Sequence, residues 1–129
     1  MTTPPAAPTP AELQVLRVLW SRGPTTVREA HEALYAGTET GYTTTLKLLQ
    51  NLHAKGLVER DEGQRQHVYA AVAREDDTLR GVLRGLIDRA FDGSGAALAM
   101  HALEATPATP EELVELKELI QRLERQGRK

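Results

Sequence analysis

The stretch from Tyr42 to Gly56 limits the fold of this chain more than any other part of the sequence. Its apolar side chains recur three and four residues apart, the spacing that places side chains on one face of an α-helix. Gly56 follows where such a helix would end, and glycine favours the left-handed conformation common at that point. We therefore predict one helix whose inner side consists of Thr45, Leu48, Leu49 and Leu52.

The opposite side of this predicted helix is polar, with short hydrogen-bonding side chains and little charge. Such a face can bond to base edges and phosphates in the major groove of DNA. The alternative is a solvated face on an ordinary amphipathic helix. The candidate DNA contacts on this face are Thr43, Thr44, Leu46, Lys47, Gln50 and Asn51.

These side chains suit different groups of a duplex. Lys47 and the threonines suit phosphates, whereas Gln50 or Asn51 suits an adenine edge. We expect Leu46 to point outward, where it would meet a thymine methyl group or simply remain exposed to solvent.

The segments on either side place this helix in a larger pattern. Two capping-box sequences, at residues 9–12 and 26–29, mark the starts of two earlier helices. After Gly56 the pattern changes to two short runs of strand character, residues 57–60 and 67–72. Three helices followed by a hairpin within about 65 residues are typical of a winged helix-turn-helix, in which the third helix enters the major groove.

Basic residues near the hairpin favour contact with a DNA backbone. The candidate wing contacts are Arg60, Arg65 and His67, and Lys47 and Lys55 lie on the neighbouring helix. The chain has a formal net charge of -2, and the first half is neutral, so attraction to DNA must come from local clustering. This neutrality also supports an alternative function, a winged-helix module that binds another protein and not DNA.

From Glu75 onward the sequence is helical again, in three predicted segments. A break at residues 92–95 and a linker at residues 105–108 separate them, and residues 109–112 form a third capping box. The last segment carries a heptad-like apolar seam. The candidate dimer contacts are Leu79, Val82, Leu83, Leu86, Ile87, Phe91, Leu98, Leu113, Leu116, Ile120 and Leu123.

Three helices this short cannot bury two such apolar stripes by themselves. They either fold into a compact hairpin within one chain or pair with the same helices of a second chain. We favour the second arrangement, because the two long stripes have no other obvious partner. The predicted fold is mainly α with a small β-hairpin wing: a disordered tail (1–8), a winged helix-turn-helix (9–73), a helical dimerisation region (74–126) and a frayed tail (127–129).

The remaining chemistry of the sequence gives no reason to expect an enzyme, a cofactor or a metal site. No cysteine is present, which excludes disulfides and thiolate ligands and agrees with a cytoplasmic location. The histidines lack metal-ligand spacing, and no acid has a partner base for catalysis. The start of the chain does not resemble a signal peptide, and no apolar run approaches the roughly 20 residues of a membrane helix.

Taken in order, these motifs resemble the BlaI/MecI family of penicillinase-type repressors over residues 10–124. The Tyr-Thr-Thr-Thr segment followed by Lys-Gly-Leu-Val and the wing is the most specific part. The residues that carry the resemblance are Glu12-Leu13, Leu19-Trp20, Tyr42 to Leu46, Leu49 to Leu52, Lys55 to Val58, His67 to Tyr69, Phe91 to Ser94 and Pro110 to Leu113.

The resemblance implies a homodimeric repressor that binds a dyad-symmetric operator in double-stranded DNA, with dimer contacts made by the C-terminal helices. It further implies a membrane-bound zinc metallopeptidase sensor as a partner, which inactivates the repressor by cleavage in the dimer domain. The family's usual cleaved pair is Asn-Phe, and the aligned pair in this sequence is His101-Ala102.

Overall fold

The computed structural model describes residues 7–63 and 65–127, which form two compact units. The first unit reaches Gly85 and the second begins at Leu86. This division falls inside helix α4 (Glu75–Ala90), whereas the sequence analysis placed the boundary between residues 73 and 74.

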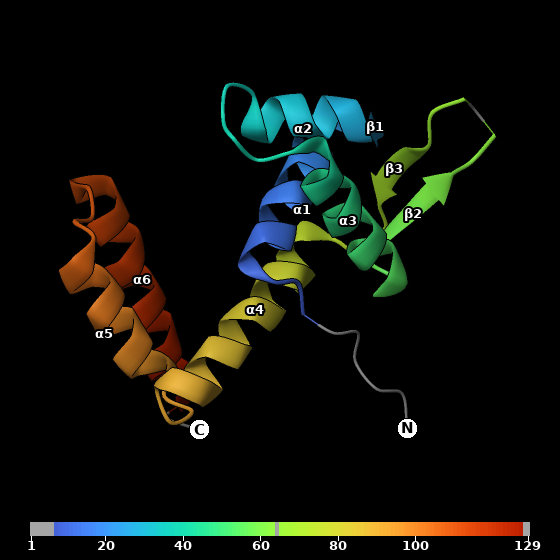
Figure 1. The fold of residues 1–129 in the computed structure, drawn as a ribbon. Helices are drawn as coiled ribbons and strands as arrows, with labels where there is room; N and C mark the ends of the chain where they lie inside the picture. Colours follow the sequence, from blue (N-terminus) through green and yellow to red (C-terminus); the bar gives the residue numbers. More distant parts are fainter. Residues whose placement is uncertain (1–6, 64, 128–129) are drawn as a thin grey trace, which may run out of the picture. The chain divides into compact units, whose positions relative to one another are not determined.

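The first unit combines three helices with a three-stranded antiparallel sheet among its described residues. The strands lie in the order β1-β3-β2, and the β2–β3 hairpin lies beside α3 (Figure 1). This arrangement confirms the predicted winged helix-turn-helix. The elements are α1 (Pro10–Arg22), β1 (Thr25–Thr26), α2 (Val27–Tyr35), α3 (Tyr42–Ala54), β2 (Val58–Asp61) and β3 (Val68–Ala71).

Both predicted capping boxes form in this unit and fix where α1 and α2 begin. At the start of α1, the Glu12 amide donates to Thr9 Oγ1 at 3.2 Å, and the Thr9 amide donates to Glu12 Oε1 at 3.0 Å. Thr26 and Glu29 make the same reciprocal pair at 3.1 and 3.0 Å. Each box satisfies backbone donors that have no partner within the helix.

The core of the first unit lies between its helices and the sheet. On α3, Thr45, Leu49 and Leu52 are buried and Leu48 is half-buried, which confirms the predicted inner side of this helix. Gly56 has a φ of 78°, so it supplies the left-handed residue that ends α3. The buried core residues are Val15, Leu16, Leu19, Val27, Ala30, Leu49, Leu52, Leu57, Val58 and Tyr69.

Trp20 is half-buried and packs against this core. Its indole Nε1 donates a hydrogen bond to the Ala73 carbonyl oxygen at 2.9 Å. A buried indole N–H usually finds a hydrogen-bond acceptor, and here that acceptor connects α1 to the segment that follows β3.

The sequence analysis did not predict strand β1. Thr25 pairs with Tyr69 and Thr26 with Val68, so β1 depends on a partner strand that lies beyond α2, α3 and β2 in the sequence. Two residues are also too few to show the alternation by which a strand is recognised. The other two strands match their predicted runs to within one residue at each end.

The second unit contains the end of α4, α5 (Gly95–Ala105) and α6 (Pro110–Gly127). Thr109 and Glu112 form the third predicted capping box, with bonds of 2.9 and 3.1 Å. Helices α5 and α6 lie side by side (Figure 1). Along the described parts of α4, α5 and α6, no residue is buried.

Two residues that the sequence assigned to the tails, Ala7 and Gly127, take part in the described structure. Ala7, placed in the disordered tail, has a carbonyl oxygen that accepts a hydrogen bond from Lys55 Nζ at 3.2 Å. Gly127, placed in the frayed tail, is the last residue of α6, because the helical seam before it continues without a break. Residues 1–6 and 128–129 lie outside the described residues.

Candidate nucleic-acid interface

The outer side of α3 presents the polar face that the sequence predicted. Thr43, Thr44, Lys47, Gln50 and Asn51 are all exposed, while the opposite side of the helix is buried in the core. Glycine occupies the N-cap position, and no acidic residue lies in the first turn. The positive end of the helix dipole is therefore not offset by a local carboxylate.

Leu46 does not point outward as the sequence analysis expected. It is half-buried and packs against the core of the first unit, because its position on the helix lies close to the buried side of Thr45 and Leu49. Only part of its side chain is available to a thymine methyl group.

Lys55, assigned to the basic patch by sequence, instead ties α3 to α1. Its Nζ forms an ion pair with Glu12 Oε1 and a hydrogen bond to the Ala7 carbonyl oxygen. Glu12 is only 3% exposed. Burial by itself would raise the pKa of Glu12, but the bonds from Lys55 and Thr9 outweigh it and hold that pKa below its ordinary value.

Arg60 on the wing is also engaged within the protein. Its Nη2 lies 2.6 Å from Glu62 Oε1, and the side chain is largely covered. It stands opposite Tyr69 in the β2–β3 pairing. Arg60 Nε and the Tyr69 hydroxyl are both buried, and neither has a hydrogen bond of good geometry among the described residues. The nearby Tyr69 hydroxyl, and then the Glu62 carboxylate, nevertheless raise the pKa of Arg60.

Arg65 and His67 are exposed in the loop that joins β2 to β3, and both line the same hollow as the start of α3. This hollow has a volume of about 250 Å³ and is lined by Val27, Tyr42, Leu46, Arg65, Gln66 and His67. The structure therefore brings two of the three predicted wing contacts, Arg65 and His67, to the first turns of α3. Gln64 lies outside the described residues.

Tyr42 and His31 also belong to this surface and were not predicted from the sequence. Tyr42 is the first residue of α3 and is 47% exposed. The His31 ring lies 6.1 Å from the Tyr42 ring, edge to face, and His31 Nδ1 lies 3.1 Å from Thr45 Oγ1. His31 lies on α2 and Tyr42 on α3. The sequence did not indicate that their rings would meet, because the two helices come together only in the folded chain.

The predicted dimer contacts remain accessible in this single chain. Exposed members are Leu79, Leu83, Leu86, Leu113, Ile120 and Leu123. Half-buried members are Val82, Ile87, Phe91, Leu98 and Leu116.

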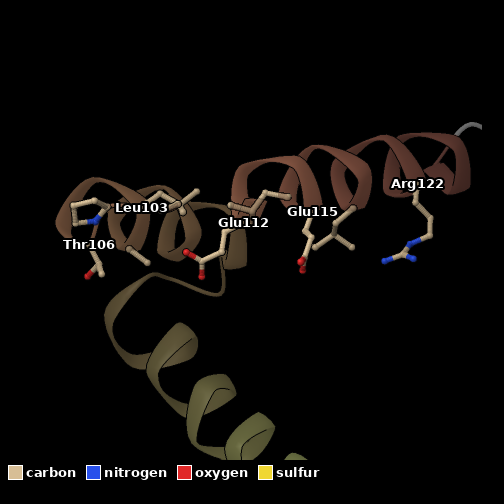
Figure 2. Close-up of a pocket in the computed structure, with 10 residues that line it drawn as sticks. Leu103, Thr106, Glu112, Glu115 and Arg122 are labelled. Atoms are coloured by element: carbon tan, nitrogen blue, oxygen red, sulfur yellow. The ribbon is translucent and has the colours of Figure 1, made fainter. Parts of the chain in front are cut away.

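Helices α5 and α6 also border an open groove of about 550 Å³ within the second unit. Figure 2 shows Leu103 and Thr106 at the α5 side and Glu112, Glu115 and Arg122 along α6. His101 and Ala102 lie inside α5, and the His101 ring packs against Phe91 with 5.4 Å between ring centroids. The aligned cleavage pair is therefore helical in this structure.

Within residues 7–63 and 65–127, no cluster of three or more His, Asp or Glu side chains has the geometry to hold a metal ion. Within the same part of the chain, no helix is long and apolar enough to cross a membrane.

This chain is similar to a known protein family and to curated relatives over most of its length. Residues 8–122 match the family model of the penicillinase repressor. The transcriptional regulator BlaI of Mycobacterium tuberculosis, from strains CDC 1551/Oshkosh and ATCC 25618/H37Rv, is 40% identical over 95 residues. That alignment covers 72% of this chain and 69% of the relative.

Solved structures agree with this relationship. The solution structure of the DNA-binding domain of the repressor BlaI is 26% identical, with a TM-score of 0.50 over 60% of this chain and 93% of that domain. The crystal structure of YusO from Bacillus subtilis shares the fold, with 22% identity and a TM-score of 0.53 over 91% of this chain and 74% of that one. The chain therefore belongs to the penicillinase repressor family of transcriptional regulators.

Proposed function

We propose that two copies of this chain bind one dyad-symmetric operator and repress transcription from it. Each copy places the outer side of α3 in the major groove and its wing on the adjacent backbone. The observation that carries this proposal is the two-sided character of α3, whose inner side is buried while its outer polar side is exposed next to Arg65 and His67.

The side chains on α3 divide into two groups by chemistry. Lys47 and the hydroxyls of Thr43 and Thr44 bind phosphates, which sets the register without reading the sequence. Gln50 and Asn51 reach base edges, where a side-chain amide pairs with adenine N6 and N7. Binding of this kind needs no catalytic residue and no cofactor.

The exposed apolar residues of α4, α5 and α6 support dimerisation as part of this function. Full burial of one leucine or isoleucine stabilises by roughly 1.5–3 kcal/mol, so covering one that is already about half covered stabilises by about 1 kcal/mol. Leu113, Ile120 and Leu123 repeat along one side of α6 and are 45–55% exposed. A twofold dimer presents identical surfaces to one another and would set two α3 helices about 34–36 Å apart on the duplex.

We further propose that a membrane metallopeptidase sensor releases the repressor by cleavage within α5. The family relationship supports this step, and His101 and Ala102 are exposed in α5. A protease takes its substrate in an extended form, so α5 must open locally before cleavage. Mass spectrometry of the chain from induced cells should show a fragment ending in α5; only intact chain under those conditions would contradict this step.

Footprinting of the region upstream of the chain's own gene tests the DNA-binding function. We expect two protected half-sites about one helical turn apart, with binding that weakens as salt rises. Gln50→Ala and Asn51→Ala should change the preferred bases, whereas Gln14→Ala, at an exposed position on α1, should not. Absence of any DNA complex at low salt would instead favour a winged-helix module that binds protein.

A further inference from the structure

The hollow beside the first turn of α3 contains a residue that the proposed set of DNA contacts does not include. We propose that Tyr42 is a further DNA-contacting residue, and that the hollow takes one phosphate and its deoxyribose where the DNA backbone passes between α3 and the wing. This inference deepens the proposed function above and rests on it.

The lining of the hollow matches a sugar-phosphate in polarity. Val27 and Leu46 supply apolar surface, while Arg65, Gln66 and His67 carry side chains that can donate hydrogen bonds. No carboxylate is among the lining residues, although Asp61 and Glu62 lie nearby in the sequence. The charge of the hollow therefore complements an anion.

The size of the hollow favours a small group over a separate ligand. Its volume of about 250 Å³ lies below the roughly 300–1,000 Å³ of pockets that enclose drug-sized molecules. It is also open, and it lies between the two elements that the proposed function places on DNA. One backbone unit of a bound duplex fits these constraints better than a diffusible effector.

Tyr42 is held in a defined position at this hollow. Its ring stands edge to face against the His31 ring, and His31 Nδ1 lies 3.1 Å from Thr45 Oγ1, which is completely buried. The Tyr42 hydroxyl makes no hydrogen bond with another described residue. An aromatic donor that is fixed before binding loses little conformational entropy when the phosphate arrives.

Tyr35 provides a matched control for Tyr42. It lies on the same His31 ring, with 6.0 Å between centroids compared with 6.1 Å for Tyr42, but it does not line the hollow. Replacing either tyrosine with phenylalanine removes one hydroxyl and retains the ring contact. Because Tyr42 lines the hollow and Tyr35 does not, only the loss of the Tyr42 hydroxyl should affect a phosphate bound there.

The test measures DNA binding of the full chain by fluorescence anisotropy, with the duplex protected in the footprint and a shuffled duplex of the same length. We expect Tyr42→Phe to weaken binding about tenfold on both duplexes, because a phosphate contact does not depend on base sequence. The salt slope should stay unchanged, because tyrosine is neutral. Arg65→Gln should lower the slope by about 0.9 for each copy bound, and Tyr35→Phe should bind as the original chain does.

A set of duplexes with one neutral methylphosphonate each locates the contacted phosphate. At one position in each half-site, the neutral group should weaken the original chain but add little to the loss in Tyr42→Phe. Circular dichroism melting of Tyr42→Phe checks that the fold is kept. Equal binding by Tyr42→Phe and the original chain, or a loss tied to no phosphate, would overturn this inference while leaving the repressor function intact; failure of the original chain to bind any duplex would overturn both.

Discussion

Two lysines, Lys47 on α3 and Lys55 at its C-cap, should have different effects when each is replaced by glutamine. Lys47 is exposed and makes no ion pair or hydrogen bond with another described residue. Lys55 is bound to Glu12 and to the Ala7 carbonyl oxygen. We predict that Lys47→Gln weakens DNA binding and leaves the fold as stable as before, whereas Lys55→Gln destabilises the fold and leaves the salt dependence of DNA binding unchanged.

The expected loss for Lys55→Gln follows from what its partner would face. The Glu12 carboxylate would keep the hydrogen bond from the Thr9 amide at 3.0 Å but would lose its charged donor. A hydrogen bond to a charged group contributes about 1.5–3 kcal/mol, and partial exposure of Lys55 screens the interaction, so we expect about 2 kcal/mol. In a domain of 60–100 residues this corresponds to a fall in Tm of about 8–16 °C.

Melting by circular dichroism and DNA anisotropy over a series of salt concentrations give the two readouts. The magnitude of the salt slope should fall by about 0.9 for each copy carrying Lys47→Gln. If Lys55→Gln lowered the slope and left Tm unchanged, Lys55 would be a DNA contact and the pairing argument would be refuted.

Three further outcomes follow from single contacts. The pKa of Glu12 is lower in the folded chain than its ordinary value of about 4.3. The Glu12 charge therefore stabilises the fold above that pH, and this stabilisation is lost as the pH falls through the folded pKa. In urea titrations, the stability difference between the original chain and Glu12→Gln should shrink from pH 7 to pH 3. Leu83→Asp combined with Leu86→Asp should give a single-chain particle by light scattering, and a dimer would contradict the proposed apolar contact. Trp20→Phe should cost about 1 kcal/mol in the same titrations by removing the bond to Ala73, and unchanged stability would show that this bond has no net effect.

Much of the fold could be predicted from sequence because its signals are local. A capping box joins residues three apart, so Thr9 with Glu12 and Thr26 with Glu29 could be recognised without knowing the rest of the chain. The inner side of α3 could be predicted for the same reason, since helical spacing alone assigns Thr45 to the core.

The features that were missed depend on residues far apart in the sequence. The sequence shows which residues are charged but not which charges are paired in the fold, so Lys55 and Arg60 were predicted to contribute to the DNA-binding surface. Lys55 pairs with Glu12 on α1, which packs against α3. Arg60 pairs with Glu62 and lies opposite Tyr69. Tyr42 was assigned to the motif but not to the surface, because its exposure is set by how α2 and α3 meet.

The division of charges also predicts how the whole dimer should respond to salt. On α3 and the described part of the wing, Lys47 and Arg65 carry formal positive charge without an ion pair to another described residue, whereas Lys55 and Arg60 are paired with acids. Two copies then bring four cations to phosphates, and the expected slope of log affinity against log salt is about -3.6 at 0.9 per phosphate. Proteins with 6–10 phosphate contacts have steeper slopes, so the uncharged face of α3 must supply a larger share of the binding free energy here. A measured slope steeper than about -6 would mean that Lys55 and Arg60 leave their acids when DNA binds.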